Sequence, residues 1–174
     1  APLTGERRGQ GDGRGVAYGV WTIGVVQLYH TGGLLRCLLG GFFMASMSDY
    51  LERKLLDHTL GTTAYTFPST VYLSLHVGDP TDVTATALST EVVGGSYGRQ
   101  IIEFVAATGT SGLTDNEIAC VFPDMPDVTV THIGIMEDLT TGELLYHGVL
   151  TTPKDLDAGD TVSVAIGAIS VTLA

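Results

Sequence analysis

Hydrophobic and polar side chains alternate along much of the chain beyond Met47. In the clearest stretch, residues 71–77, apolar side chains occupy every second position, which is typical of a β-strand with one buried face. Alternation at 102–106, β-branched residues at 128–136, and turn-forming sequences between the segments predict six further strands, at 102–106, 117–122, 128–136, 144–150, 161–166 and 169–173. The last two are expected to pair with each other around Gly167 and Ala168. A Thr/Ala-rich loop is expected to end near Thr90.

One segment has a helical period instead. Leu51, Leu55, Leu56 and Leu60 fall on or near one helical face, and Gly61 supplies a stop. Asp49 and Glu52 are the expected capping pair. These signals predict a helix at 49–60. Its apolar face is expected to dock on its own domain or on a partner, with Leu51, Leu55 and Leu56 as candidate assembly contacts.

About seven strands without intervening helices indicate a mainly β fold, arranged as an antiparallel sandwich or a barrel. We predict an antiparallel β-sandwich preceded by one short N-terminal α-helix. No internal repeat or linker interrupts residues 47–174. This part of the chain is therefore expected to be a single domain.

The charge of the chain is divided unevenly between its two parts. Residues 1–46 contain four arginines against Glu6 and Asp12, a net charge of +2 within a total of −11. The remaining residues therefore carry −13. The first segment also holds 11 of the 23 glycines. Residues 1–46 thus differ in composition from the predicted domain.

Three interpretations of residues 1–46 stay open. Arginines precede an apolar stretch, as in a signal or anchor, but no uninterrupted run approaches the ~18 apolar residues of a membrane span. The glycines would also suit a disordered arm of a virion or filament. Thirdly, the sequence Gly40-Gly41-Phe42-Phe43-Met44 is what a ribosome-binding site, a spacer and a start codon would encode in frame. On that hypothesis the natural protein starts at Met44 or Met47.

Composition also limits the classes of partner. A domain with a charge of −13 lacks the basic face that binds phosphate backbones. We therefore expect neither nucleic acid nor a membrane as a partner. Because Cys37 lies in the first segment, Cys120 is the one thiol of residues 47–174. Its apolar strand indicates a core position rather than a nucleophile.

For each sequence pattern that could indicate catalysis, a structural role explains the residues better. Residues 94–98 match the G-x-S-x-G pattern of a nucleophile elbow, but they precede a predicted strand rather than a helix. A glycine-rich turn is the preferred interpretation. A glycosidase needs two distinguished carboxylates, and nothing singles out two acids here. We therefore expect no enzymatic activity.

Two groups of side chains are candidates for binding a metal ion. His76, His132 and His147 on neighbouring strands could bind zinc, but their spacing matches no common ligand pattern. The acidic loop 155–160 could attract calcium, but Gly159 and Ile166 depart from the EF-hand pattern. Ordinary hydrogen-bonded histidines and solvated turn carboxylates are preferred, so no metal or other cofactor is expected.

Short motifs in a fixed order then point to a family. They are Asp49-Tyr50-Leu51-Glu52, Lys54-Leu55-Leu56-Asp57-His58, Thr63-Ala64-Tyr65-Thr66, Thr70-Val71-Tyr72-Leu73, Asp79-Pro80-Thr81-Asp82, Glu91-Val92, Gly94-Gly95-Ser96-Tyr97, Arg99-Gln100, Thr131-His132-Ile133-Gly134-Ile135, Thr141-Gly142, Leu144-Leu145-Tyr146, Leu150-Thr151-Thr152-Pro153-Lys154 and Ala158-Gly159-Asp160-Thr161. From about Met47 to Leu173 the chain resembles small tailed-bacteriophage proteins described as tail-fibre-like or minor virion proteins. One difference is that Asp124-Met125-Pro126-Asp127 occupies an approach where such proteins often carry Trp.

The resemblance implies a non-enzymatic structural protein of the virion. It would assemble as a homo-oligomer, for which a trimer would suit a fibre, and with other capsid or tail proteins. The alternative is a module that binds host-surface carbohydrate through Tyr65, Tyr72, Tyr97 or Tyr146. The resemblance implies no catalytic residues.

One basic residue is expected to be structural. Arg99 is one of four basic residues in the acidic domain, the others being Arg53, Lys54 and Lys154. We expect it to form an ion pair with Glu91 or Glu103.

Overall fold

The computed structural model describes residues 36–39, 46–107 and 112–173. These residues form ten strands and two helices: β1 (Arg36–Leu39), β2 (Ser46–Met47), α1 (Asp49–Thr59), β3 (Val71–His76), α2 (Thr84–Thr90), β4 (Gln100–Ile102), β5 (Leu113–Asp115), β6 (Cys120–Phe122), β7 (Val128–Met136), β8 (Leu144–Leu156), β9 (Thr161–Val164) and β10 (Ser170–Thr172). The predicted mainly β fold, with antiparallel sheets and a short helix near the N-terminus, is confirmed. The structure has three strands that were not among the predicted seven, namely β1, β2 and β5.

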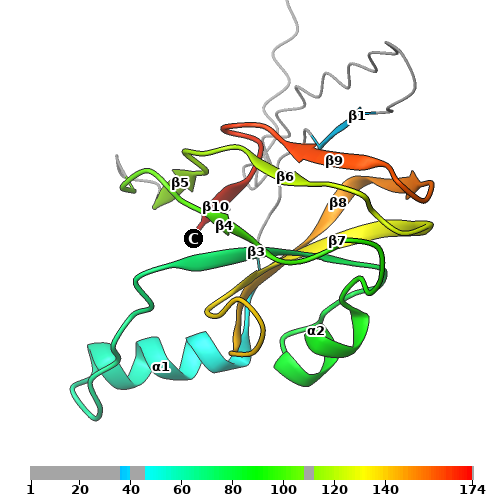
Figure 1. Ribbon diagram of the computed structural model, residues 1–174. Helices are drawn as coiled ribbons and strands as arrows, with labels where there is room; N and C mark the ends of the chain where they lie inside the picture. The colour runs from blue at the N-terminus through cyan, green and yellow to red at the C-terminus, as the bar shows by residue number, and fades with distance from the viewer. Residues whose placement is uncertain (1–35, 40–45, 108–111, 174) are drawn as a thin grey trace, which may run out of the picture.

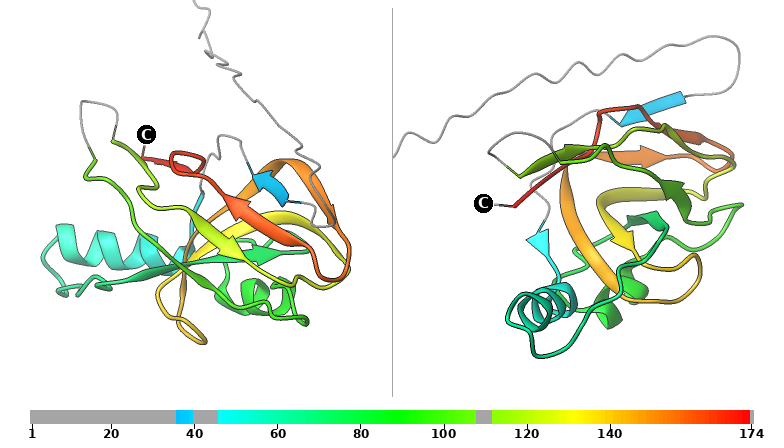
Figure 2. Two further views of the ribbon diagram at one scale, coloured as in Figure 1. Left: turned by 45° about the horizontal axis from the view of Figure 1, so that its top comes forward. Right: turned by 90° about the vertical axis from the view of Figure 1, so that its left-hand side faces the viewer.

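The main sheet has five antiparallel strands in the order β2-β8-β7-β3-β4. A second sheet has the order β1-β9-β6, and β10 pairs with β5. Among the described strands, β1 and β9 form the parallel pair. Strands β6 and β9 lie over β7 and β8, whereas both helices lie on the opposite side of the main sheet (Figures 1 and 2).

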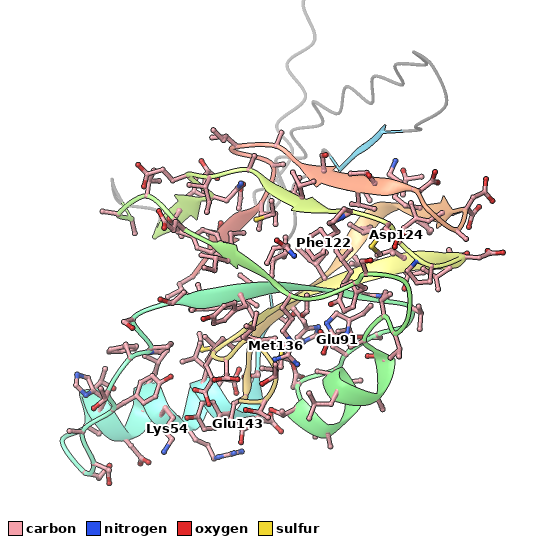
Figure 3. The ribbon with its side chains drawn as sticks, in the orientation of Figure 1. Lys54, Glu91, Phe122, Asp124, Met136 and Glu143 are labelled. Carbon is pink, nitrogen blue, oxygen red and sulfur yellow. The ribbon has the colours of Figure 1, made fainter. Side chains whose placement is uncertain are left out.

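The principal core fills the space between these two layers. Leu73 and Leu75 from β3 and Phe122 from β6 are completely buried, and Figure 3 shows Phe122 between the layers. Burial of such side chains contributes about 1.5–3 kcal/mol each. Cys120 lies in this core as predicted, and burial raises the pKa of its thiol to about 11.

The N-terminal helix begins at Asp49 as predicted, but its N-cap lies one residue earlier than the predicted capping residue. Ser48 is the N-cap, and its hydroxyl accepts a hydrogen bond from the Leu51 amide. Asp49 and Glu52 instead place negative charge in the first turn, which the helix dipole favours. The helix ends at Thr59, with Gly61 in the left-handed region at φ +73°. Only glycine adopts that conformation without steric cost.

The prediction of a loop up to Thr90 is wrong, because residues 84–90 form helix α2. Threonine is a weak helix former, and Val83 provides no side-chain cap. The helix is instead held by the sheet. Its Ala87 is buried against Met136 and Leu144, and the Thr84 hydroxyl accepts a hydrogen bond from the Leu144 amide.

The predicted pairing of 161–166 with 169–173 is also wrong. β9 pairs with β6 and β1, whereas β10 pairs with β5. The physical reason is Asn116, which is buried and binds the turn between them. Its side chain donates to the carbonyl of Ala165 and accepts from the amide of Ile169. The chain is thereby directed from one strand pair to the other.

β8 continues six residues beyond its predicted end and includes Pro153. The register between β7 and β8 shifts between Val130 and His132, which lie opposite Lys154 and Val149 respectively. Pro153 falls in this irregularity, where proline is tolerated because no regular ladder hydrogen bond is required. The strand therefore passes through a residue that usually ends strands.

Candidate functional site

Helix α1 separates the predicted assembly contacts into two groups. Leu51 is only 4% exposed and packs with Ile135, Leu145 and Val171 of its own domain. Leu55 is half-buried beside the same cluster. Leu56, by contrast, is 59% exposed. Of the three predicted contacts, Leu56 is therefore the one that the structure leaves available to a partner.

The start of α1 is fixed to the main sheet. The backbone amide of Ser48 donates to the carbonyl of Leu145 at 3.0 Å, and its hydroxyl donates to the carbonyl of Leu144 at 2.5 Å. The amide of Asp49 also donates to the carbonyl of Asp82. The position of the helix is thus defined by β8 and by the loop after β3.

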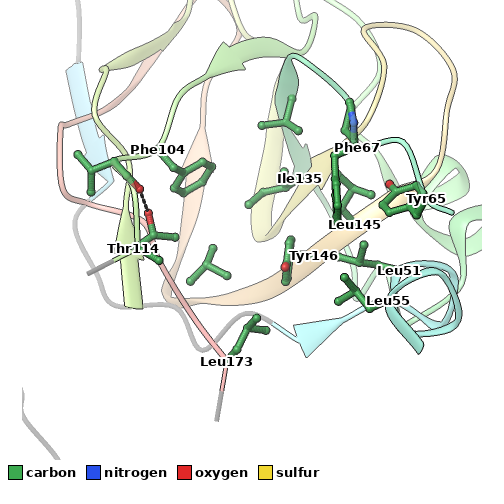
Figure 4. Close-up of a pocket in the computed structure, with 15 residues that line it drawn as sticks. Leu51, Leu55, Tyr65, Phe67, Phe104, Thr114, Ile135, Leu145, Tyr146 and Leu173 are labelled. Atoms are coloured by element: carbon green, nitrogen blue, oxygen red, sulfur yellow. Dashed lines mark hydrogen bonds between the residues drawn. The ribbon is translucent and has the colours of Figure 1, made fainter. Parts of the chain in front are cut away.

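An apolar pocket of about 420 Å³ lies between α1, the loop after it, the main sheet and the β5–β10 pair. Figure 4 shows Tyr65 and Phe67 on one side of this pocket and Phe104 and Thr114 on the other. Leu51 and Leu55 form its helical wall. The sequence did not reveal the pocket, because its walls come from segments more than 100 residues apart. The one local feature of the sequence that could have indicated the pocket is the pair of aromatic residues Tyr65 and Phe67 in a loop.

Aromatic side chains gather between α1 and this loop. The ring centroids of Tyr65 lie 6.3 Å from Tyr50 and 4.6 Å from Phe67, both in edge-to-face arrangements that favour aromatic packing. The Lys54 ammonium lies 5.5 Å from the Tyr50 ring centroid. Burial, with a smaller effect from the Glu137 carboxylate, raises the pKa of Tyr50 to about 12. These contacts hold the loop against the helix.

Arg99 and Glu91 form a buried, bidentate ion pair. Arg99 Nε donates to Glu91 Oε1 at 2.9 Å and Nη2 donates to Oε2 at 2.8 Å. Nη1 donates to the backbone carbonyls of Asp138 and Thr141, each at 2.7 Å. The exposed Glu103 is not part of this ion pair. Arg99 therefore connects the segment before β4 to the β7–β8 turn.

Tyr97 belongs to the same network. Its hydroxyl donates to Glu91 Oε1 at 2.8 Å and accepts from the Leu75 amide at 3.0 Å, and its ring stacks on Phe122. Burial and the Glu91 charge both raise the pKa of Tyr97 well above its usual value. The hydroxyl therefore stays protonated and is committed to contacts within the domain.

The G-x-S-x-G segment is a turn, as predicted. Gly94 and Gly95 both have positive φ, and the chain continues into β4 rather than into a helix. The Ser96 hydroxyl donates to Asp124 Oδ2 at 2.6 Å. Ser96 thus ties two loops together and has the carboxylate, not a histidine, as its partner.

The three candidate zinc histidines have different surroundings. His76 is fully buried between Ser74 Oγ at 2.8 Å and Thr90 Oγ1 at 3.2 Å. His132 lies opposite His76 in the sheet, whereas His147 Nε2 lies 2.9 Å from Asp82 Oδ1. In the described ranges, no three histidine, cysteine, aspartate or glutamate side chains group closely enough to hold a metal ion.

Two carboxylates of the acidic segment 155–160 accept hydrogen bonds within the domain. Asp155 Oδ1 accepts from the Thr129 hydroxyl at 2.6 Å, which links β8 to β7. Asp160 Oδ2 accepts from the Asp157 amide at 3.0 Å, and Gly159 has φ +92°. The Asp160 bond and the conformation of Gly159 define a tight turn.

Buried His76 is expected to make stability depend on pH. Burial lowers its pKa from 6.5 to about 4, so the unfolded chain takes up this proton first. The free energy of unfolding should then fall by about 3 kcal/mol between pH 6.5 and 4, and this contribution should level off below pH 4. Urea denaturation at pH 7, 5.5 and 4 measures the effect.

The matched variants for this experiment are His76→Asn and His58→Asn. His76→Asn should lose most of this dependence, whereas His58→Asn, on the exposed surface of α1, should retain it. Identical pH profiles for the two variants would show that His76 is not responsible.

No helix in the described part of the chain is long and apolar enough to cross a membrane.

The structure thus combines a β-rich domain with a docked helix, α1, that carries the exposed Leu56. Comparison with family models defines the class further, because residues 46–172 match the model for Podophage GP4 fiber I protein gp80. The chain belongs to this family of phage fibre proteins. It is therefore a structural component of a phage virion. No curated protein matches the sequence.

Proposed function

We propose that this protein is a non-enzymatic fibre subunit that acts by assembling with copies of itself and with another protein of the tail or capsid. The observation that carries the proposal is the family match over residues 46–172, which includes nearly all of the described domain. We expect the subunit to form a trimer, and its partner to be another protein of the tail or capsid.

The exposed side of α1 supports this assembly role. Leu56 and Leu60 are 59% and 74% exposed, and Leu60 directly follows the helix as its C-cap. Leucine side chains contribute most to an interface when they become fully buried there. We assign Leu56 and Leu60 as partner contacts. Leu51 and Leu55 position the helix that carries them.

Replacing both exposed leucines by serine is expected to weaken assembly at least about tenfold, because two apolar side chains would lose their burial in the partner. Size-exclusion chromatography with light scattering across a dilution series measures the change. Deleting residues 47–60 would be less informative, since that would also remove Leu51 from the domain's own core.

Ile166→Ser is the matched control, because Ile166 is 67% exposed in the turn between β9 and β10, in the layer on the opposite side of the main sheet from α1 (Figure 1). It should leave the oligomer distribution unchanged. All variants should unfold at nearly the same temperature. An unchanged distribution for the double variant would refute the assignment of α1 as an assembly element.

The alternative function, binding of host-surface carbohydrate, needs aromatic side chains that are free to stack on a sugar. Tyr97 is committed to Glu91 and Phe122, so Tyr97→Ala would report on folding rather than on a sugar contact. A glycan array remains the direct test of this alternative.

A further inference from the structure

The lining of the apolar pocket beside α1 includes a tyrosine hydroxyl that is free to bind a ligand. Tyr146, on β8, contributes to the pocket lining. Its hydroxyl makes no hydrogen bond to any other residue that the structure describes, and that of Thr114 is already donated to the Val105 carbonyl. The Tyr65 hydroxyl, also in the lining, lacks a hydrogen-bond partner as well, but it is buried away from solvent. The Tyr146 hydroxyl is therefore the free donor that a ligand can reach within an otherwise hydrophobic lining.

The size of the pocket suits a small molecule. A cavity of about 150 Å³ accommodates benzene, and typical ligand pockets begin near 300 Å³. At about 420 Å³, this pocket accommodates a body of two aromatic rings or an equivalent aliphatic chain. Phe67, Phe104 and Tyr146 provide aromatic surfaces for such a body (Figure 4).

The charge of the surroundings further restricts the ligand. No charged side chain lines the pocket, so an ionic group placed there would lose its hydration without gaining a partner. The domain's charge of −13 also disfavours the approach of an anion. Burial raises the pKa of Tyr146, so the phenol stays neutral and can donate at neutral pH.

We propose that this pocket is a binding site for a neutral, mainly apolar small molecule that carries one hydrogen-bond acceptor, which the Tyr146 hydroxyl recognises. The site is independent of the proposed assembly role, because it uses the inner wall of α1 rather than Leu56 and Leu60. A variant that no longer binds the small molecule can therefore still be tested for assembly, and a variant that no longer assembles can still be tested for binding.

Three probes of similar size separate the contributions. 2-Acetylnaphthalene has the apolar body and an acceptor, 2-ethylnaphthalene lacks the acceptor, and 2-naphthoate is an anion. Titration of the full chain followed by NMR should show saturable, submillimolar binding of 2-acetylnaphthalene. 2-Naphthoate should bind at least about tenfold more weakly, because its charge would be desolvated.

Tyr146→Phe is the critical variant. It should weaken binding of 2-acetylnaphthalene by about 3- to 10-fold, the usual effect of one lost hydrogen bond, and leave binding of 2-ethylnaphthalene within about twofold. Because only one oxygen atom is removed, the melting temperature should be nearly unchanged, which shows that the fold is intact.

Two tryptophan substitutions test the location. Val105→Trp, on the exposed rim of the pocket, should block both uncharged probes. Val93→Trp, at a residue that is 83% exposed and outside the lining, should change neither. The proposal is overturned if the native protein binds no probe saturably, if 2-naphthoate binds as tightly as the ketone, or if Tyr146→Phe weakens both uncharged probes equally.

Discussion

Replacing Arg99 by methionine is expected to lower the free energy of unfolding by about 3–5 kcal/mol, the usual cost of removing one partner from a buried ion pair. The Arg99 and Glu91 side chains are only 3% and 12% exposed. The variant would therefore leave a carboxylate with little access to water. The carbonyls of Asp138 and Thr141 would lose their donor as well. Equilibrium denaturation in urea at pH 7 measures the loss.

The control for this experiment is Lys54→Ala on α1. The Lys54 ammonium has the Tyr50 ring as its neighbour, and an exposed cation–π contact contributes about 0.5–1 kcal/mol. A smaller loss than for Arg99→Met is therefore expected. Arg99→Met combined with Glu91→Leu should recover part of the stability, because no buried charge would remain unpaired. Equal losses for Arg99→Met and Lys54→Ala would contradict the structural role of the pair.

Gly95→Ala is expected to destabilise the domain by about 3 kcal/mol, from the cost of a left-handed conformation together with overpacking. Gly95 has φ +57°, and an added Cβ would lie 2.3 Å from the carbonyl oxygen of Asp124 and 3.0 Å from the amide nitrogen of Pro126. Both obstacles are backbone atoms, so the loop would have to separate from residues 124–126. Thermal and urea denaturation measure the effect.

Gly98→Ala provides a control within the same motif. An added Cβ at Gly98 meets no atom within 4 Å, and its φ is not positive. This variant should change stability by less than about 0.5 kcal/mol. If Gly95→Ala and Gly98→Ala proved equally stable, the close approach of the two loops would not be a determinant of the fold.

These two experiments concern a segment whose sequence resembles a catalytic motif. Gly95 is explained by the close approach of Asp124, Gly94 by its positive φ, and Arg99 by the buried carboxylate of Glu91. The chemistry of a nucleophile elbow is not needed to account for either. The segment is a structural connection between the β7–β8 turn and the loop after β6.

Local patterns predicted two of the three longest strands and the first helix well. β7 has the predicted bounds, and β3 ends one residue before its predicted end, whereas β8 continues six residues beyond its prediction. The same patterns could not predict α2, whose residues are poor helix formers stabilised by the sheet beneath Ala87. Local patterns also could not predict which strands pair. Asn116 directs the chain from β9 to β10 through hydrogen bonds to Ala165 and Ile169, which are 49 and 53 residues away in the sequence.

In the candidate site, too, local patterns predicted the elements but not their long-range contacts. The helical period identified α1 correctly, but a period alone does not show which leucines face the domain. The structure places Leu51 inside and Leu56 outside because Ser48 fixes the rotation of the helix through β8. Arg99 was expected to find a nearby carboxylate, yet only the fold brings Glu91 rather than Glu103 to the guanidinium.

The anchor of α1 has a consequence for the synthesis of the protein. Ser48 and its partner Leu144 are 96 residues apart, so a ribosome adding about 5–20 residues per second needs roughly 5–20 s to supply the second after the first. During this interval the leucines of α1 have no sheet to pack against. A chain that has not yet reached Leu144 therefore lacks the positioned helix. The sequence separation of this one contact thus delays the positioning of α1 until β8 has begun to be synthesised.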